Sequence, residues 1–130
     1  MSKSPITCHV LDSSLGKPAA GVQVTVQEYH TIAESTSMFE PFAEGKTDSD
    51  GRCMQLWPKA TAEHNAEQRA KLKAGALYKV VFKTKVYFES TGRKCFYPWV
   101  EITFEVSNPD EHHHIPLLIS PYSFTTYRGS

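Results

Sequence analysis

The chain has 130 residues, a mass of 14.6 kDa and equal numbers of basic and acidic side chains, 14 of each. This length fits one domain, residues 1–130, with a single core. The even charge balance excludes the broad electropositive surface that nucleic acids and acidic membranes require, so any charge selectivity must be local.

The N-terminal part predicts two strands joined by a turn. Residues Ile6–Leu11 alternate with period two, which places His9 on the face opposite Ile6. The turn-rich segment Asp12–Pro18 follows. Val22–Gln27 then alternates between apolar and polar side chains, as expected of a strand with one solvated face.

The middle of the chain mixes turn, strand and helix signals. Residues Phe39–Lys46 have a mixed pattern, and Thr47–Gly51 is a strong turn signal that places Arg52 at the start of a short strand ending at Leu56. Residues Thr61–Lys73 are rich in Ala, Glu, Gln, Lys and Arg, so they predict a surface helix.

The C-terminal part predicts mainly strands. Leu77–Thr84 and Val100–Val106 are β-branched and aromatic, and Val86–Thr91 between them indicates a short helical turn. His112–Ile119 and Tyr122–Tyr127 predict two more strands, separated by a Ser-Pro step. About eight short strands with one or two short helices indicate an all-β fold, an antiparallel β-sandwich.

Three consecutive histidines begin the penultimate predicted strand. On a strand His112 and His114 project from one face and His113 from the other. A metal site is one interpretation, but two histidines on one strand need a third ligand from elsewhere. The other interpretation is purely structural: the three histidines form a solvated strand edge and have no chemical role.

The three cysteines and the first residues bear on redox state and location. An odd number of cysteines without CxxC spacing argues against a disulfide framework and a structural zinc site, so we expect reduced, buried or half-buried thiols. No secretory signal or membrane-length apolar run is visible. We therefore expect a cytoplasmic protein, with a peroxisomal location as the alternative.

Four separated motifs, in this order, carry a resemblance to a known family. They are Cys8–Asp12, Thr47–Arg52, Glu111–Tyr122 and the final Tyr127–Ser130. Together they resemble the transthyretin family and, within it, the 5-hydroxyisourate hydrolases, over nearly the whole chain. The segments 28–40 and 59–75 diverge most. The final four residues resemble the hydrolases and not the hormone carriers, although an edge strand that simply ends is the plain structural interpretation.

The resemblance implies a site, an activity and an assembly. The catalytic positions fall on His9, Arg52, His114 and Ser130, while Tyr127, Arg128 and His112 are implied to contact substrate. The implied reaction is hydrolysis of 5-hydroxyisourate to 2-oxo-4-hydroxy-4-carboxy-5-ureidoimidazoline, with no cofactor, no metal and no nucleic-acid or membrane partner. The family also implies a homotetramer made as a dimer of dimers. His113 departs from the tyrosine that relatives tend to have between the two histidines.

The chemistry of these residue types agrees with the implied reaction. Opening a lactam with water requires proton removal from the nucleophile, charge stabilisation on the carbonyl oxygen and protonation of the leaving nitrogen. Histidine exchanges protons near neutrality, and the planar arginine fork suits an oxygen-rich ring. The alternative is a carrier that binds a small apolar ligand in a channel between subunits. The side chains of His9, Arg52, His114 and Arg128 would make the wall of that channel too polar for such a ligand.

Overall fold

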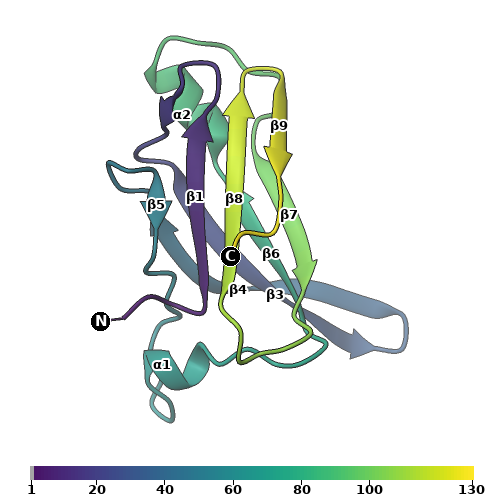
Figure 1. Cartoon of the computed structure of the whole chain (residues 1–130). Coiled ribbons are helices and arrows are strands. Elements are labelled where there is room, and N and C mark those ends of the chain that lie inside the picture. The colour runs from purple at the N-terminus through teal and green to yellow at the C-terminus, as the bar shows by residue number, and fades with distance from the viewer. Residues whose placement is uncertain (1) are drawn as a thin grey trace.

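Two β-sheets pack face to face to form a sandwich in the computed structural model, which describes residues 2–130 (Figure 1). The first sheet has the strand order β2-β1-β8-β9, with β5 paired to β1, and the second has the order β4-β3-β6-β7. The elements are β1 Ile6–Asp12, β2 Lys17–Pro18, β3 Gln23–Ala33, β4 Thr36–Lys46, β5 Arg52–Cys53, α1 Ala66–Arg69, β6 Leu77–Phe82, α2 Thr84–Ser90, β7 Val100–Glu105, β8 His113–Ser120 and β9 Ser123–Thr126. The all-β transthyretin-like sandwich predicted from sequence is confirmed.

One pairing departs from the expected antiparallel pattern. Strand β1 runs parallel to β8, with Thr7 beside His114 and His9 beside Pro116. Parallel neighbours need a long connection, and here almost the whole chain, including the second sheet, lies between the two strands. Figure 1 shows them side by side at the centre of the first sheet. This pairing joins the N-terminal and C-terminal motifs.

The core lies between the two sheets and follows the period-two pattern of the sequence. On β1 the side chains of Ile6, Cys8 and Val10 are buried, and on β8 the same holds for Ile115 and Leu117. Side chains of β3, β6 and β7 complete this core from the second sheet. Because the apolar residues of β1 and β8 turn inward, the residues that alternate with them along each strand must lie on the outer face of the first sheet.

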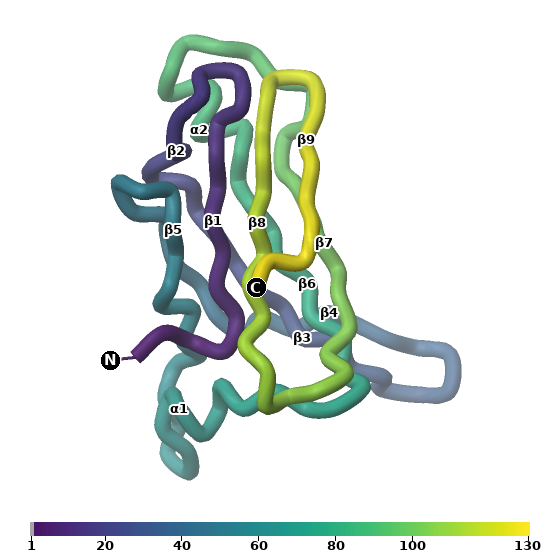
Figure 2. Tube along the Cα trace, viewed as in Figure 1, coloured from purple at the N-terminus to yellow at the C-terminus, as the bar shows by residue number. Residues whose placement is uncertain are grey.

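The hairpin of β3 and β4 is longer than the sequence predicted. The two strands pair from Gln23 to Ala33, and their outer half extends beyond the body of the sandwich (Figure 2). An edge-to-face contact between Tyr29 and Phe39, with ring centroids 5.0 Å apart, supports that outer half. The segment 39–46, whose pattern was mixed, is therefore strand.

Two other predicted elements are shorter in the structure. The helix predicted over 61–73 is the single turn α1, capped by reciprocal hydrogen bonds between Asn65 and Gln68. The segment has helical composition but lacks an apolar stripe, so packing does not extend the helix. Strand β5 ends at Cys53 and not at Leu56. The helical turn predicted over 86–91 is confirmed as α2.

Within residues 2–130, neither helix has the length and hydropathy that a bilayer crossing needs.

Candidate active site

His9 and Arg52 lie directly opposite each other on β1 and β5. The next pair along, Val10 and Gly51, is linked by a backbone hydrogen bond of 2.7 Å, so His9 and Arg52 form a non-hydrogen-bonded pair. In such pairs the α-carbons approach to about 4.5 Å and the side chains share one face. Both side chains therefore start from the same patch of the outer face.

A glycine before Arg52 makes this approach possible. Gly51 has a φ of +76°, and a β-carbon there would lie 2.3 Å from the carbonyl oxygen of Val10. Only glycine fits such a position without displacing the backbone. The Asp48 carboxylate then accepts hydrogen bonds from the backbone N–H groups of Asp50 and Arg52, which fixes the turn.

The hydrogen bond of the His9 ring determines where its proton lies. Nε2 of His9 is 2.9 Å from the backbone carbonyl oxygen of Asp50. A carbonyl can only accept, so Nε2 carries the hydrogen and donates it. In the neutral ring Nδ1 then holds the lone pair. His9 is half-buried, which leaves this nitrogen available to accept a proton.

His114 is held through a buried threonine. Thr7 is fully buried, and its Oγ1 lies 2.7 Å from Nδ1 of His114 and 2.7 Å from Nε2 of His112. The two rings stack with centroids 6.4 Å apart. His112 and His114 thus share the outer face, as the strand pattern predicted, and Nε2 of His114 is the ring nitrogen not bound to Thr7.

Burial favours the neutral form of both of these imidazoles. The pKa of His114 is lowered first by desolvation and then by the positive charges of His9, Arg52 and Lys3. Desolvation also lowers the pKa of His112, with Lys3 and His114 adding to the effect. A neutral imidazole can accept a proton, so these shifts suit acid–base chemistry near neutral pH.

The C-terminal segment folds back onto the same strand. The backbone N–H of Gly129 donates to the carbonyl of His114 over 3.0 Å. A β-carbon on Gly129 would lie 2.7 Å from Cδ2 of His114 and 3.1 Å from Cγ of Pro116, so the tail packs tightly on the histidine. Figure 1 shows the chain's end over β8, beside β1. Ser130, adjacent to Gly129, is exposed.

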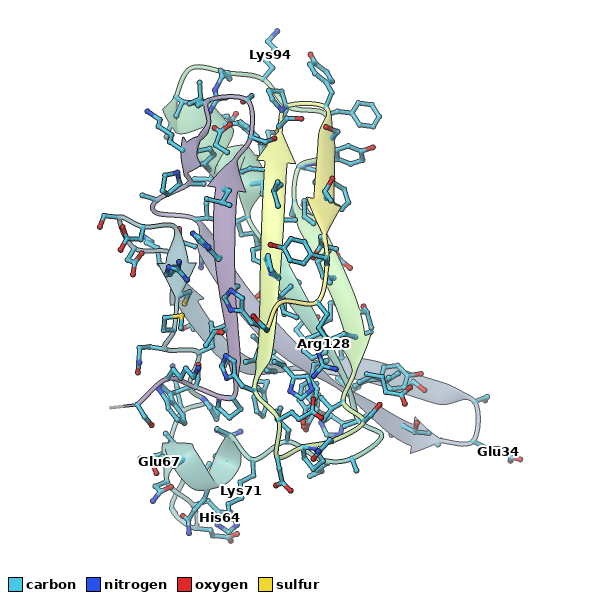
Figure 3. The ribbon with its side chains drawn as sticks, viewed as in Figure 1. Glu34, His64, Glu67, Lys71, Lys94 and Arg128 are labelled. Carbon is cyan, nitrogen blue, oxygen red and sulfur yellow. The ribbon has the colours of Figure 1, made fainter. Side chains whose placement is uncertain are left out.

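Tyr127 and Arg128 lie beside His114, on the side that faces β7. Arg128 bonds to the Glu111 carboxylate at 2.6 Å, and its labelled side chain lies low on the sandwich in Figure 3. Both residues border a hollow that His114 of β8 and residues of β7 also line. Within one chain, therefore, His9, Arg52, His114 and the tail's Gly129 share the outer face, whereas Arg128 is paired with Glu111.

His113 points to the other side of β8, as predicted. Its ring is buried and stacks on Phe104 of β7 with centroids 5.9 Å apart. Among the described residues its Nδ1 has no hydrogen-bond partner. Burial lowers the pKa of this ring, with Arg128 adding to the effect. His113 therefore belongs to the edge of the core and not to the group on the outer face.

The histidines do not form a metal-binding cluster. In residues 2–130, no three side chains of His, Cys, Asp or Glu converge in a way that could hold a metal ion. The neighbouring nitrogens of His112 and His114 are both bound to Thr7. The three cysteines are free in this structure, with Cys8 and Cys53 buried and Cys95 half-buried, as the sequence predicted for their burial.

Residues 6–129 match the family model described as the HIUase/Transthyretin family. The chain belongs to this family. It is 38% identical to the 5-hydroxyisourate hydrolase of Salmonella dublin over 125 residues, which cover 96% of this chain and 80% of that protein. Residues 6–129 contain the first three motifs that suggested the resemblance and the fourth as far as Gly129.

Two solved structures of the HIUase/Transthyretin type resemble this one. The 5-hydroxyisourate hydrolase of Klebsiella pneumoniae superposes with a TM-score of 0.70 at 28% identity, over 96% of this chain and 98% of that one. Sea bream transthyretin in complex with thyroxine superposes with a TM-score of 0.73, also at 28% identity, over 96% and 94%. The fold is thus shared by a hydrolase and by a thyroxine-binding protein.

Sequence reasoning missed two parts of the site. Thr7 was seen only as a member of an alternating strand, although its place two residues before His9 puts it on the same face. The carbonyl of Asp50, which fixes the His9 ring, carries no side-chain signal at all. The role of Thr7 is revealed only by the parallel pairing of β1 with β8. The role of the Asp50 carbonyl is revealed only by the geometry of the turn.

Proposed function

We propose that this protein hydrolyses 5-hydroxyisourate to 2-oxo-4-hydroxy-4-carboxy-5-ureidoimidazoline, a step of urate degradation. The observation that carries the proposal is the grouping of His9, Arg52 and His114 on one outer face, beneath a tail fixed to His114. The Salmonella and Klebsiella relatives that bear the hydrolase name support it.

The proposed chemistry uses the two free imidazole nitrogens. Nδ1 of His9 accepts a proton from the attacking water, because Nε2 already donates to Asp50. The hydroxide forms a bond to the lactam carbonyl carbon, and the C–N bond then breaks. The proton on His9 is delivered to the leaving nitrogen, and His114 is the second proton-exchanging group, which accepts at Nε2 the proton that the new carboxyl group releases. Two imidazoles on adjacent strands can divide these roles without a metal ion.

Arg52 is proposed to act on the charge that develops on the carbonyl oxygen. Its side chain is exposed, its backbone is fixed by Asp48, and it starts from the position opposite His9. A planar guanidinium offers several donors to an oxygen-rich ring and keeps its charge at all relevant pH values. Ser130, which adjoins Gly129 over His114, is proposed to anchor the ring or the water.

The remaining substrate contacts are proposed to need an assembly. Strands β7 and β9 end their sheets on the same side of the sandwich, and each pairs with a single neighbour in the described chain. The aromatic side chains of Phe96, Tyr97 and Phe124 lie exposed near that side. Exposed strand edges beside aromatic groups favour association. We therefore propose a homotetramer in which a neighbouring subunit closes the site around Tyr127, Arg128 and His112.

A carrier function is the alternative, since sea bream transthyretin binds thyroxine on the same fold. The outer face argues against it, because His9, Arg52, His112 and His114 would lose their water to an apolar ligand without recovering hydrogen bonds. With a flat polar substrate these side chains would form new hydrogen bonds in place of those to water.

One assay separates the two functions. Urate is oxidised enzymatically to 5-hydroxyisourate, and its disappearance is followed spectrophotometrically with and without the protein. We expect a large acceleration, and Arg52→Lys should retain charge but lose most of the rate because the planar fork is gone. An unchanged decay, together with saturable thyroxine binding, would instead identify a carrier.

A further inference from the structure

Thr7 occupies an unusual position between two histidines. Its side chain is fully buried on the outer side of β1, and its single hydroxyl lies 2.7 Å from a nitrogen of each ring. A hydroxyl has one hydrogen to donate and lone pairs with which to accept. It can therefore donate to only one ring and must accept from the other.

This constraint couples the tautomers of the two rings. If Thr7 donates to Nδ1 of His114, then Nε2 of His112 must carry a hydrogen and donate to Thr7, so both neutral rings are protonated on Nε2. If Thr7 donates to Nε2 of His112, then Nδ1 of His114 donates to Thr7, and both neutral rings are protonated on Nδ1. The rings thus carry matching tautomers in either arrangement.

We propose that Thr7 is a positioning residue that relays a proton between His114 and His112 and so resets His114 between turnovers. Its kinetic consequence rests on the hydrolase function proposed above. The relay assigns His112 to proton exchange with the surroundings of the site.

The proposed step moves one proton and conserves every bond count. A proton bonds to Nε2 of His114, the Nδ1–H bond of that ring breaks, and its proton bonds to the Thr7 oxygen. The original O–H bond of Thr7 breaks at the same time, and that hydrogen bonds to Nε2 of His112. His114 returns to a neutral ring, His112 becomes the cation, and the hydroxyl is restored. No other reactant is needed.

The outer end of this path reaches the surface. His112 is half-buried and borders a surface hollow that Lys3, Asp110 and Glu111 also line, so a proton on it has carboxylates and solvent nearby. The inner end faces His9 of β1 and Arg52 of β5, whose charges act on His114. His113 on β8 adds its own effect on His112. The relay therefore runs from the face of His9 and Arg52 to a surface hollow lined by Lys3 and Lys71 as well as by Glu67, Asp110 and Glu111.

The test compares Thr7→Val, which keeps the shape but removes the hydroxyl, with Thr7→Ser, which keeps the hydroxyl. We expect Thr7→Val to lower kcat about 10- to 100-fold with KM nearly unchanged, and Thr7→Ser to retain most of the rate. Thr84→Val is the matched control, because Thr84 is a buried threonine on α2 outside the site. A kcat for Thr7→Val within about twofold of the parent would overturn the relay.

A second variant keeps the test decisive if Thr7→Val fails to fold. His112→Gln keeps a hydrogen-bonding group beside Thr7 but cannot titrate. We expect it to lower kcat and to leave one ionisation fewer in the rate–pH profile. The double variant should cost no more than the larger single effect, since the two residues act in one chain. Multiplicative losses would refute a shared path.

A spectroscopic measurement separates this inference from the hydrolase proposal. Imidazole ¹⁵N shifts of the intact protein, taken above the titration range, report the tautomer of each ring without any substrate. We expect His112 and His114 to show the same tautomer in the parent and in Thr7→Ser. Unlike tautomers would overturn the coupling even in an active enzyme, and matching ones would support it even if 5-hydroxyisourate were not the substrate.

Discussion

The backbone N–H of Gly129 donates to the carbonyl of His114 over 3.0 Å, and the two residues lie too close for any side chain to fit between them. A β-carbon at position 129 would reach within 2.7 Å of the His114 ring. That ring cannot move away freely, because its Nδ1 is bound to the buried Thr7. The tail and the proposed proton-exchanging ring are therefore positioned by each other.

Gly129→Ala should displace the tail from His114 without unfolding the sandwich. We expect kcat/KM to fall about tenfold, equivalent to ~1.4 kcal/mol, because the substrate-facing end of the tail moves. The melting temperature should hardly change, since the tail follows the last strand. Glu34→Ala at the exposed tip of the β3–β4 hairpin is a suitable control (Figure 3). Equal kcat/KM in Gly129→Ala and the control would show that the tail takes no part in the site.

His9→Gln tests the proposed base while keeping the local hydrogen bond. The glutamine amide can still donate to the carbonyl of Asp50, but it cannot accept a proton in place of Nδ1. We expect kcat to fall by about 10²- to 10⁴-fold with the melting temperature unchanged. His64→Gln, an exposed histidine near α1, should have no effect. A His9→Gln rate within a few-fold of the parent would remove His9 from the mechanism.

The sequence predicts the faces of this site better than its connections. Alternation with inward-facing Ile6 and Val10 places His9 on the outer face, and the same rule separates His113 from its neighbours. These expectations need only local geometry. They are confirmed because the buried residues of β1 and β8 form the core.

The hydrogen bonds that connect the site depend on contacts between distant parts of the chain. Thr7 meets His112 and His114 across separations of 105 and 107 residues, which no local pattern encodes. The same holds for the turn carbonyl at Asp50, 41 residues from His9. The helix overestimated at 61–73 shows the opposite error, because composition favours a helix that tertiary packing does not extend.

The lowered pKa of His114 predicts the position of the acid limb of the rate–pH profile. If the neutral ring is needed, activity should persist below the ordinary histidine pKa of about 6.5. Lys3 contributes to the lowering in both His112 and His114. Lys3→Met should therefore shift the acid limb to higher pH, as measured by kcat/KM against pH. Lys94→Met, exposed at the far end (Figure 3), should leave it in place.

The same shifts predict a loss of stability in mild acid. The pKa values of His112, His113 and His114 are all lowered in the folded protein, so the unfolded chain binds protons first as pH falls. The stabilisation from these three neutral rings is complete above about pH 6.5, and it is lost as pH falls towards their lower pKa values in the folded protein. We expect the melting temperature to drop between pH 7 and 5. A flat profile over this range would contradict the burial effect.

Phe124 tests the proposed assembly. It lies exposed on the edge strand β9 and makes an edge-to-face contact with Tyr97 at a centroid distance of 5.1 Å. We expect the parent to sediment as a tetramer and Phe124→Asp to dissociate, because a charge in an apolar interface is costly to desolvate. Ile32→Asp, exposed on the β3–β4 hairpin, is the control. A parent that sediments as a monomer would refute the proposed assembly.

Asp12 at the end of β1 holds that strand to α2 and to the segment that follows it. Its buried carboxylate accepts hydrogen bonds from Tyr87 at 2.9 Å and from Arg93 at 2.6 Å. Burial alone would raise the pKa of Asp12, but the bonds from Arg93, Ser14 and Tyr87 outweigh it and lower the pKa to about 2. The carboxylate therefore stabilises the fold above the unfolded pKa of about 3.9, and this contribution is lost as pH falls through 2.

Asp12→Asn should reduce the free energy of unfolding at pH 7 by about 2–3 kcal/mol, because the amide NH2 must face donors in either orientation: those of Tyr87 and Arg93, or the backbone N–H groups of Ser14 and Leu15. Denaturant unfolding of both proteins measures this difference, with the exposed Glu63→Gln as the control. The difference should shrink between pH 4 and 2, where the parent's carboxylate takes up its proton. A difference that stays constant over that range would mean that Asp12 acts through packing and not through its charge.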